Sequence, residues 1–460
     1  MKYRLRTLVR VSSIMLALVT FPWTARAAGP KFEVIYRFKG GTDGFSPSAA
    51  LISDTLGNIY GTTAFGGTGA ACKDQNNPGC GTVFSLRPPT LSGGAWTETV
   101  LYRFRGGSDG AVPQSPLISD ANGNLYGTTT EGGTVGCLAF NGTAVGCGIV
   151  FELIHPRKSG GAWTERVLYR FKGVPSGRGN GDGAQPNGIV FDRKGNLYGS
   201  TVWGGSCTTT EGGVVCLGSV FRLAPPSNGG AWRESVLHRF AGADNNPHGG
   251  LILDKKSNLY GTTYVSANGN GTVFELVAPH THNGAWKEMA LYEFKGGSDG
   301  ANSNAGLVWY GSGNLYGTTL EGGISNAGTV FQLTRPELPN GSWTESILHR
   351  FNNSDGNTPL ANLIIDNDGN LYSTTQAGGS IGQGTVFRLS PPPAGGTGWV
   401  ETVIRSFGVP RNGLYPDSGL MLGKDGALYG TTPTGGVKGA GDCVWEGSSA
   451  ACGVVFRLAP

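Results

Sequence analysis

The sequence predicts an all-β fold, a seven-bladed β-propeller built from four-stranded antiparallel blades. The first observation is a Gly-Asn-Leu-Tyr-Gly-Thr-Thr type segment that recurs at intervals of 56 to 72 residues. Its tyrosines are Tyr60, Tyr126, Tyr198, Tyr260, Tyr316, Tyr372 and Tyr429. The second is that each repeat holds four short segments rich in β-branched and aromatic residues, bounded by Gly, Pro, Asn or Asp. The third is that no long segment shows the apolar period of a helix.

Each repeat is expected to contribute four strands in a fixed order. In the second repeat these are residues 113–120, 124–129, 148–153 and 163–171. A tight Asp/Asn-Gly turn joins the first two strands, because Asp caps its own backbone and glycine takes a positive φ. A variable loop follows the second strand, and a Pro-rich loop ending in Gly-Gly-Ala-Trp follows the third. The alternative, a β-solenoid, has shorter coils without a long alternating fourth strand.

The two ends of the chain carry complementary strand types. Residues 32–38 have the pattern of a fourth strand, and residues 453–458 have the pattern of a third strand. We therefore expect the N-terminal strand to pair with the last blade as its outermost strand. This pairing closes the ring and removes an open sheet edge.

The first 27 residues have the three-part pattern of a secretory signal peptide: a basic head, an apolar run and an Ala-Arg-Ala motif ending at Ala27. The run is shorter than the roughly 20 residues that span a bilayer, so we expect cleavage, no membrane span, and one propeller domain over 28–460. The leader holds five of the 35 basic residues and none of the acidic ones, which leaves 30 basic against 31 acidic residues. This balance argues against nucleic acid as a partner, because nucleic-acid binding uses a basic face.

The eight cysteines fall into four local pairs, each in the variable stretch between a Gly-Thr-Thr type segment and the following Gly-Thr-Val-Phe type segment. An even count, short spacing and an exported chain favour disulfides. Metal binding is the weaker alternative, because CxxC spacing is absent. We expect each pair to close a local loop on the same face of the ring. The pairs are Cys72/Cys80, Cys137/Cys147, Cys207/Cys216 and Cys443/Cys452.

The ordered motifs resemble a known repeat family. Asp-Gly-x-x-Pro, Leu-Ile-x-Asp, Gly-Asn-Leu-Tyr-Gly-Thr-Thr, Gly-Gly, Gly-Thr-Val-Phe and Leu-Tyr-x-Phe recur in this order over nearly all of residues 32–460. The run resembles the GloVer repeat of choice-of-anchor tandem-repeat proteins, which are exported bacterial proteins. The strand order also resembles NHL-type propellers, which implies that the Leu-Ile-x-Asp strand lines the central channel and the Trp…Phe strand is outermost. Family members often end in a surface-sorting segment; this chain ends at Pro460 without one, so secretion or periplasmic residence is expected.

The repeated polar residues are interpreted as structural. The signature Tyr and Thr occur in every copy, which favours packing between sheets over a site. One Asp-Gly aspartate per repeat does not supply the converging oxygens that Ca²⁺ needs, so these residues are interpreted as turn caps. They are Asp43, Asp109, Asp182, Asp299 and Asp355. The pair in His280-Thr281-His282 lacks a third ligand nearby in the sequence. We therefore expect no metal and no cofactor.

Aromatic residues without a fixed counterpart in the repeat lie in the variable loops, and some of these loops hold a cysteine pair. They are Phe65, Phe140, Trp203, Tyr264 and Trp445. Exposed aromatics on pinned loops suit stacking on flat ligands such as sugar rings, and binding often resides in variable loops held by a rigid scaffold. Ordinary packing under long loops is the alternative. We expect a ligand to contact these residues, with Trp203 and Trp445 foremost.

Two classes of function follow from the sequence. The first is an exported, monomeric, non-catalytic binding or scaffold module for a glycan or an extracellular protein. The second is an extracellular enzyme of the glycan lyase or hydrolase type, with its site at one mouth of the channel; it rests on analogy with other propellers. No Ser-His-Asp order, Gly-x-Ser-x-Gly, HExxH or P-loop motif is present, so no catalytic residue is predicted. Paired carboxylates that meet only in three dimensions stay open.

Overall fold

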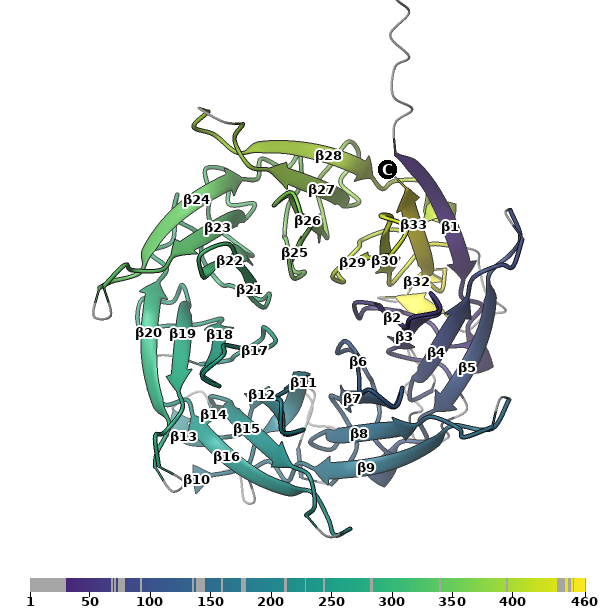
Figure 1. Cartoon of the computed structure of the whole chain (residues 1–460), viewed down its shortest axis with the longest axis horizontal. Helices are drawn as coiled ribbons and strands as arrows, with labels where there is room; N and C mark the ends of the chain where they lie inside the picture. Colours follow the sequence, from purple (N-terminus) through teal and green to yellow (C-terminus); the bar gives the residue numbers. More distant parts are fainter. Residues whose placement is uncertain are drawn as a thin grey trace, which may run out of the picture.

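The strands of the chain form seven four-stranded antiparallel sheets arranged around a central channel (Figure 1). The computed structural model describes residues 30–67, 69, 72, 79–91, 93–134, 136–137, 145–158, 160–174, 179–210, 213–227, 229–242, 245–281, 284–338, 341–393, 396–436, 443–445, 448–449 and 451–459. The expected leader, residues 1–27, lies outside them. The predicted seven-bladed propeller is confirmed.

The blades are numbered here along the chain, each from its inner to its outer strand. Blade 1 is β2 (Ile52–Ser53), β3 (Ile59–Thr63), β4 (Thr82–Arg87) and β5 (Thr97–Arg103); blade 2 is β6 (Ile118–Ser119), β7 (Leu125–Thr129), β8 (Ile149–Ile154) and β9 (Thr164–Arg170). Blade 3 is β11 (Ala184–Phe191), β12 (Leu197–Trp203), β15 (Ser219–Ala224) and β16 (Arg233–Arg239); blade 4 is β17 (Ile252–Leu253), β18 (Leu259–Thr263), β19 (Thr272–Val277) and β20 (Lys287–Glu293). Blade 5 is β21 (Val308–Tyr310), β22 (Asn314–Thr319), β23 (Thr329–Thr334) and β24 (Thr344–Arg350); blade 6 is β25 (Ile364–Ile365), β26 (Leu371–Thr375), β27 (Thr385–Ser390) and β28 (Val400–Ser406). Blade 7 is β29 (Met421–Leu422), β30 (Leu428–Thr432), β33 (Val454–Ala459) and β1 (Lys31–Arg37).

Two small sheets lie outside the blades. One contains β10 (Gly179–Asn180), β13 (Ser206–Thr210) and β14 (Gly213–Cys216); the other pairs β31 (Val444–Trp445) with β32 (Ser448–Ser449). Their strands lie before the first strand or after the second strand of a blade. The four inner-to-outer strands of each blade match the order that the NHL-type likeness implied (Figure 1).

The N-terminal strand closes the ring, as predicted. β1 pairs antiparallel with β33, from Lys31 opposite Ala459 to Arg37 opposite Val454. The first strand of the propeller in the sequence is therefore the outer strand of the last blade. Main-chain hydrogen bonds join the two ends of the chain, and the edge of β33 is covered.

Aromatic pairs join consecutive blades. The phenylalanine that follows each outer strand is at most 1% exposed and packs against the third-strand phenylalanine of the next blade. The ring centroids of these pairs lie 5.0–5.3 Å apart, mostly edge-to-face, an arrangement that the aromatic quadrupole favours. The pairs are Phe38–Phe84, Phe104–Phe151, Phe171–Phe221, Phe240–Phe274, Phe294–Phe331, Phe351–Phe387 and Phe407–Phe456.

Most signature threonines of the described blades satisfy their hydroxyls within the scaffold; Thr62, whose buried Oγ1 has no partner there, is an exception. In blade 4 the hydroxyl of Thr262 donates to the carbonyl of Ala305 in the next blade (3.0 Å), which ties the two blades together. The hydroxyls of Thr263 and Thr272 lie 2.8 Å apart between the second and third strands of the same blade. All three threonines are buried. Their recurrence is therefore explained by structure, because a buried hydroxyl without a partner is costly.

The Asp-Gly aspartates also act structurally. The Asp43 carboxylate accepts a hydrogen bond from the Tyr36 hydroxyl (2.7 Å) and another from the Lys39 backbone N–H (2.8 Å). The tyrosine contact recurs as Tyr102 to Asp109 (2.7 Å), Tyr169 to Asp182 (2.6 Å) and Tyr292 to Asp299 (2.8 Å). Each pair ties the end of an outer strand to the turn that starts the next blade.

The eight cysteines form the four predicted disulfides, with Cα atoms 4.1–5.3 Å apart. Each closes the loop between the second and third strands of blade 1, 2, 3 or 7. Four disulfides fit an oxidising, extracellular environment. Among the described residues, no helix has the length and apolarity needed to cross a membrane. The bonds are Cys72–Cys80, Cys137–Cys147, Cys207–Cys216 and Cys443–Cys452.

The cysteines lie in these loops, as expected, but several are buried more deeply than their place in the sequence indicates. The second cysteine of three pairs is fully buried, at 0% exposure, and belongs to the hydrophobic core: Cys80, Cys147 and Cys452. The carbonyl of each accepts a hydrogen bond of 3.0 Å from the turn that starts the next blade; the donors are the backbone N–H groups of Val112, Gln185 and Ser46. The next blade covers these three positions, which spacing along the sequence does not show. They therefore anchor the variable loops to the core and present no surface to a ligand.

Candidate functional site

An open cleft lies between blades 3 and 4, with a volume of about 970 Å³. Its walls are the turn after β11, the turn after β17 and the Pro-rich loop before β20. These turns and Pro-rich loops make up one face of the ring, here called the hairpin face. The variable loops and Asp-Gly turns make up the opposite, loop face. A smaller cleft of about 460 Å³ occupies the equivalent position between blades 7 and 1.

The floor of the cleft holds an aromatic pair from two blades. Trp286 of blade 4 meets Tyr198 of blade 3 edge-on, with ring centroids 6.3 Å apart. Three other junctions have the same contact, so the repeated tryptophan has a structural role; the pairs are Trp163–Tyr60, Trp399–Tyr316 and Trp96–Tyr429. Trp286 is only half-buried and lines the cleft. Part of its ring is therefore available to a ligand.

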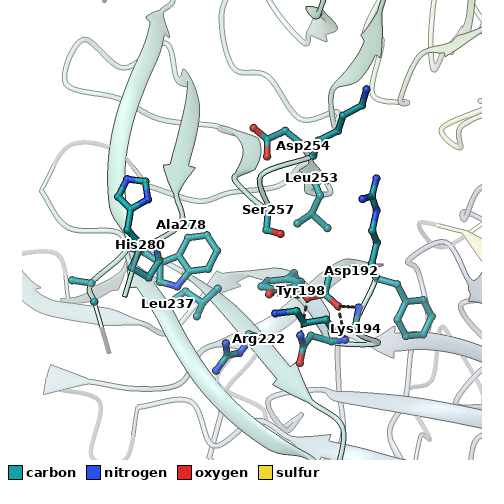
Figure 2. A pocket seen from close by; sticks show the side chains of 18 of the residues that line it. Asp192, Lys194, Tyr198, Arg222, Leu237, Leu253, Asp254, Ser257, Ala278 and His280 are labelled. Carbon is teal, nitrogen blue, oxygen red and sulfur yellow. Dashed lines mark hydrogen bonds between the residues drawn. The ribbon is translucent and has the colours of Figure 1, made fainter. Parts of the chain in front are cut away.

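Arg222 lines the cleft beside Tyr198, which it faces across the second and third strands of blade 3 (Figure 2). Its Nε is buried and makes no hydrogen bond of good geometry within the described part of the chain, although the guanidinium interacts with the Tyr198 hydroxyl; Arg388 and Tyr372 show the same arrangement in blade 6. By contrast, Arg457 at the equivalent position of blade 7 donates to Asp425 (2.6 and 3.0 Å) and to the Tyr429 hydroxyl (3.1 Å). A buried donor without a partner costs free energy, so the Arg222 guanidinium is suited to receive an anionic group.

The two aspartates of the cleft cap their own turns. Asp192 accepts hydrogen bonds from the backbone N–H groups of Lys194 (2.8 Å) and Asn196 (2.9 Å), and from the side chains of Asn196 (2.7 Å) and Tyr198 (3.3 Å). Asp254 makes the corresponding bonds in blade 4. Four local donors occupy the oxygens of each carboxylate. Neither aspartate is therefore free to act as a general acid or base.

Exposed cations surround the rim. Arg193, Lys194 and Lys255 lie exposed in the two turns. His280 lies in the Pro-rich loop on the opposite side of the cleft from Lys194 (Figure 2). The second histidine of that loop, His282, lies outside the described residues. The described lining holds the cations Arg193, Lys194, Arg222 and Lys255 against the two aspartates, so the cleft presents an excess of positive charge and attracts anions.

The central channel is a second polar space, of about 300 Å³, to which every blade contributes. Among the described residues that line it, only His248 and Asp417 are titratable. Asp417 Oδ1 is buried without a hydrogen-bond partner among the described atoms, and burial raises the pKa of this carboxyl to about 7. Burial also lowers the pKa of His248. The described lining therefore offers one carboxyl and not a pair.

The aromatics singled out from the sequence are spread over the loop face. Phe65 packs on Phe45 (5.5 Å between ring centroids), Tyr264 packs on His248 (5.3 Å), and Trp203 lies partly buried against the core between blades 2 and 3. These three belong to different junctions and do not share a cleft. Their role in binding stays a prediction. The remaining two lie outside the described residues, as a whole or in the side chain: Phe140 and Trp445.

Sequence reasoning missed Arg222 and Trp286, because both occupy positions that recur in every repeat. The sequence did hold a signal: the residue type varies between repeats at the position of Arg222, three residues after the start of each third strand. The residue at this position faces the signature tyrosine, so each change of residue type alters the chemistry of one junction. The occupants differ in size and charge: Ser85, Glu152, Arg222, Glu275, Gln332, Arg388 and Arg457.

Comparison with known proteins supports the repeat architecture. A family model described as the Gloeobacter/Verrucomicrobia repeat matches residues 20–207, 135–333 and 206–444. No curated protein matches the chain significantly.

Several solved structures are similar to the chain at low sequence identity. A fungal alcohol oxidase in complex with copper is 14% identical, with a TM-score of 0.55, over 94% of this chain and 77% of that one. A Thermus thermophilus protein described as an oxidoreductase (glucose dehydrogenase) is 19% identical, with a TM-score of 0.40, over 76% and 98%. A luciferin-regenerating enzyme is 14% identical, with a TM-score of 0.42, over 94% and 96%. The first of these shows a shared propeller fold and nothing about chemistry.

Proposed function

Because the chain belongs to the Gloeobacter/Verrucomicrobia repeat family and carries a cationic cleft between two blades, we propose that it is an exported, non-catalytic binding module for an acidic glycan. The observation that carries this proposal is the buried, unpaired Nε of Arg222 beside the half-buried ring of Trp286, both within the described cleft. A sugar that bears a carboxylate or sulfate satisfies both groups.

The two groups recognise different parts of such a ligand. A guanidinium binds a carboxylate through two parallel N–H···O bonds, which fixes the orientation of the acid. The apolar face of a pyranose ring packs on an aromatic ring, which removes apolar surface from water. Lys194 and Lys255 at the rim add attraction that falls with ionic strength.

Binding fits the cleft better than catalysis does. Hydrolysis of a glycoside uses two carboxyl groups that flank the scissile bond. The two aspartates present are held by four donors each, and Arg222 and the lysines cannot replace them. The enzyme alternative is supported by one observation, the buried Asp417 carboxyl in the channel.

The test is a glycan array of acidic and neutral oligosaccharides, followed by calorimetry with the best acidic ligand. Arg222→Gln should weaken binding about 10- to 100-fold, the range expected for losing a hydrogen bond to a charged group. Trp286→Ala should weaken it as well. The matched control is Trp399→Ala, which removes the equivalent tryptophan at the junction where blade 5 has Gln332.

Several results would contradict the proposal. Equal affinity for neutral analogues, or unchanged binding in Arg222→Gln, would exclude this cleft as the binding site for an acidic glycan. Loss of binding in Trp203→Ala with Arg222→Gln unaffected would move the site to the loop face. Conversion of the bound glycan to product, abolished by Asp417→Asn, would establish the enzyme alternative instead.

A further inference from the structure

Three side chains of metal-ligating types lie close together at the outer edge of the ring, between blades 5 and 6. His349 lies near the end of β24, Asp355 lies in the Asp-Gly turn that follows, and Glu401 lies near the start of β28 in the next blade. The outer strands β24 and β28 lie end to end at this place (Figure 1). One ligand atom from each residue lies within 4.8 Å of the other two.

Two of the ligand atoms have no other partner in the described structure. His349 Nε2 and Glu401 Oε1 are both buried and form no hydrogen bond there, although Nε2 lies 3.2 Å from Asp355 Oδ2. Asp355 Oδ1 accepts the backbone N–H of Asn352 (3.0 Å), which leaves Oδ2 to face the cluster. The imidazole ring stands edge-on against the buried ring of Phe351, with centroids 4.8 Å apart, which sets its orientation.

The repeat shows what is unusual here. At the junction of blades 4 and 5 the same three positions hold Tyr292, Asp299 and Glu345, and the tyrosine hydroxyl donates to the aspartate. A neutral tyrosine donates a hydrogen bond and is a poor ligand, whereas imidazole offers a lone pair to a cation. Replacing tyrosine by histidine therefore removes the hydrogen bond from the tyrosine hydroxyl to the aspartate. It leaves three side chains that can each act as a metal ligand.

From this geometry we propose that His349, Asp355 and Glu401 bind a divalent first-row transition metal of the Zn²⁺ type, which joins blades 5 and 6 at the rim. One imidazole nitrogen with two carboxylates suits Zn²⁺, and three protein ligands leave a fourth position for water. Ca²⁺ requires six to eight oxygen ligands and Mg²⁺ a near-octahedral oxygen shell, which this cluster does not provide. An ion bound only by the folded chain raises its stability.

A related pair, His238 and Glu288, lies between blades 3 and 4, with 3.0 Å between His238 Nε2 and Glu288 Oε2. The aspartate position of that junction lies outside the described residues. The experiment therefore uses full-length untagged protein in a His238→Tyr background, so that binding at this second pair does not enter the measurement.

The experiment titrates metal-free protein with Zn²⁺ and, separately, with Mg²⁺ and Ca²⁺, using calorimetry. We expect one equivalent of Zn²⁺ and an increase in melting temperature. His349→Tyr, which restores the residue of the other junctions, should fold normally and weaken Zn²⁺ binding by about 100-fold or more, since even the loss of an outer-shell partner costs 10- to 100-fold. Glu401→Gln should also weaken binding. Co²⁺ should give the visible absorption of a four-coordinate site in the background protein alone.

A gain of binding provides the converse test. Tyr292→His places an imidazole beside Asp299 and Glu345 and should add one equivalent of Zn²⁺. The proposal is overturned if the background protein binds no Zn²⁺, if His349→Tyr retains the same affinity and stoichiometry, or if Ca²⁺ and Mg²⁺ bind as tightly as Zn²⁺.

Discussion

Ring closure can be tested at a single side chain, Phe38. This residue follows β1, is fully buried, and packs edge-to-face on Phe84 with ring centroids 5.1 Å apart. Phe294 has the same environment in the middle of the chain: it is fully buried and packs on Phe331 at 5.1 Å. Replacing a buried phenylalanine with alanine costs about 3–5 kcal/mol, because apolar surface is lost and a cavity is left. Phe38→Ala and Phe294→Ala should therefore lower the free energy of unfolding by similar amounts.

Urea unfolding followed by fluorescence measures both variants against the wild type. The comparison is informative because the local contacts are matched and only the position in the chain differs. A domain is stable by about 5–15 kcal/mol, so either loss is a large fraction of the total. If Phe38→Ala costs less than about 1 kcal/mol while Phe294→Ala costs the full amount, the N-terminal strand is not docked and the closure is wrong. Deleting residues 28–38 should then leave the melting temperature unchanged instead of lowering it sharply.

Two further predictions concern the loops and the outer strands. Intact mass of the non-reduced protein should show no free thiol. In the double variant Cys207→Ser/Cys216→Ser the free energy of unfolding should fall by about 2–3 kcal/mol, the chain-entropy value for so short a loop. Reactive thiols, or disulfides between repeats, would contradict the assigned pairs. Burial raises the pKa of Glu98 to about 7, and does the same for Glu165, Glu234 and Glu345. The folded chain then holds protons that the unfolded chain releases, so the free energy of unfolding should fall as pH rises from about 4.5 to 7. Glu98→Gln should flatten this slope, and an unchanged slope between pH 5 and pH 8 would refute the assignment.

Much of the fold could be predicted from the sequence. The blade count and the strand order follow from motifs that recur seven times at intervals of 56 to 72 residues. The cysteine pairs follow from their short spacing, and the closure follows from the complementary strand types at the two ends of the chain. Repetition makes this possible, because each copy reports the same local environment. The interpretation of the Asp-Gly aspartates as turn caps also held, since a turn cap is a contact between near neighbours.

The burial of the cysteines could not be predicted from the sequence in the same way. Pairing of Cys80, Cys147 and Cys452 with the preceding cysteine could be predicted, because partners 8 to 10 residues apart are near neighbours. Their complete burial could not, because the covering surface is supplied by the turn of the next blade.

The candidate sites could not be predicted in the same way. Arg222 and Trp286 come from different blades, as do His349 and Glu401. In the sequence each of these residues looks like an ordinary member of the repeat. The chemistry of each residue depends on which side chain of the neighbouring blade lies next to it.

The amino-acid pattern therefore determined the blade as a unit, because strand periodicity, turn residues and local disulfides act over short distances along the chain. The tertiary structure decided what happens between blades. Within the described residues, packing of one sheet against the next leaves Nε of Arg222 without a partner beside Trp286, and places Glu401 against His349. Both outcomes arise from the contact of residues 52 and 64 positions apart in the sequence, and the sheets must pack before these side chains can meet.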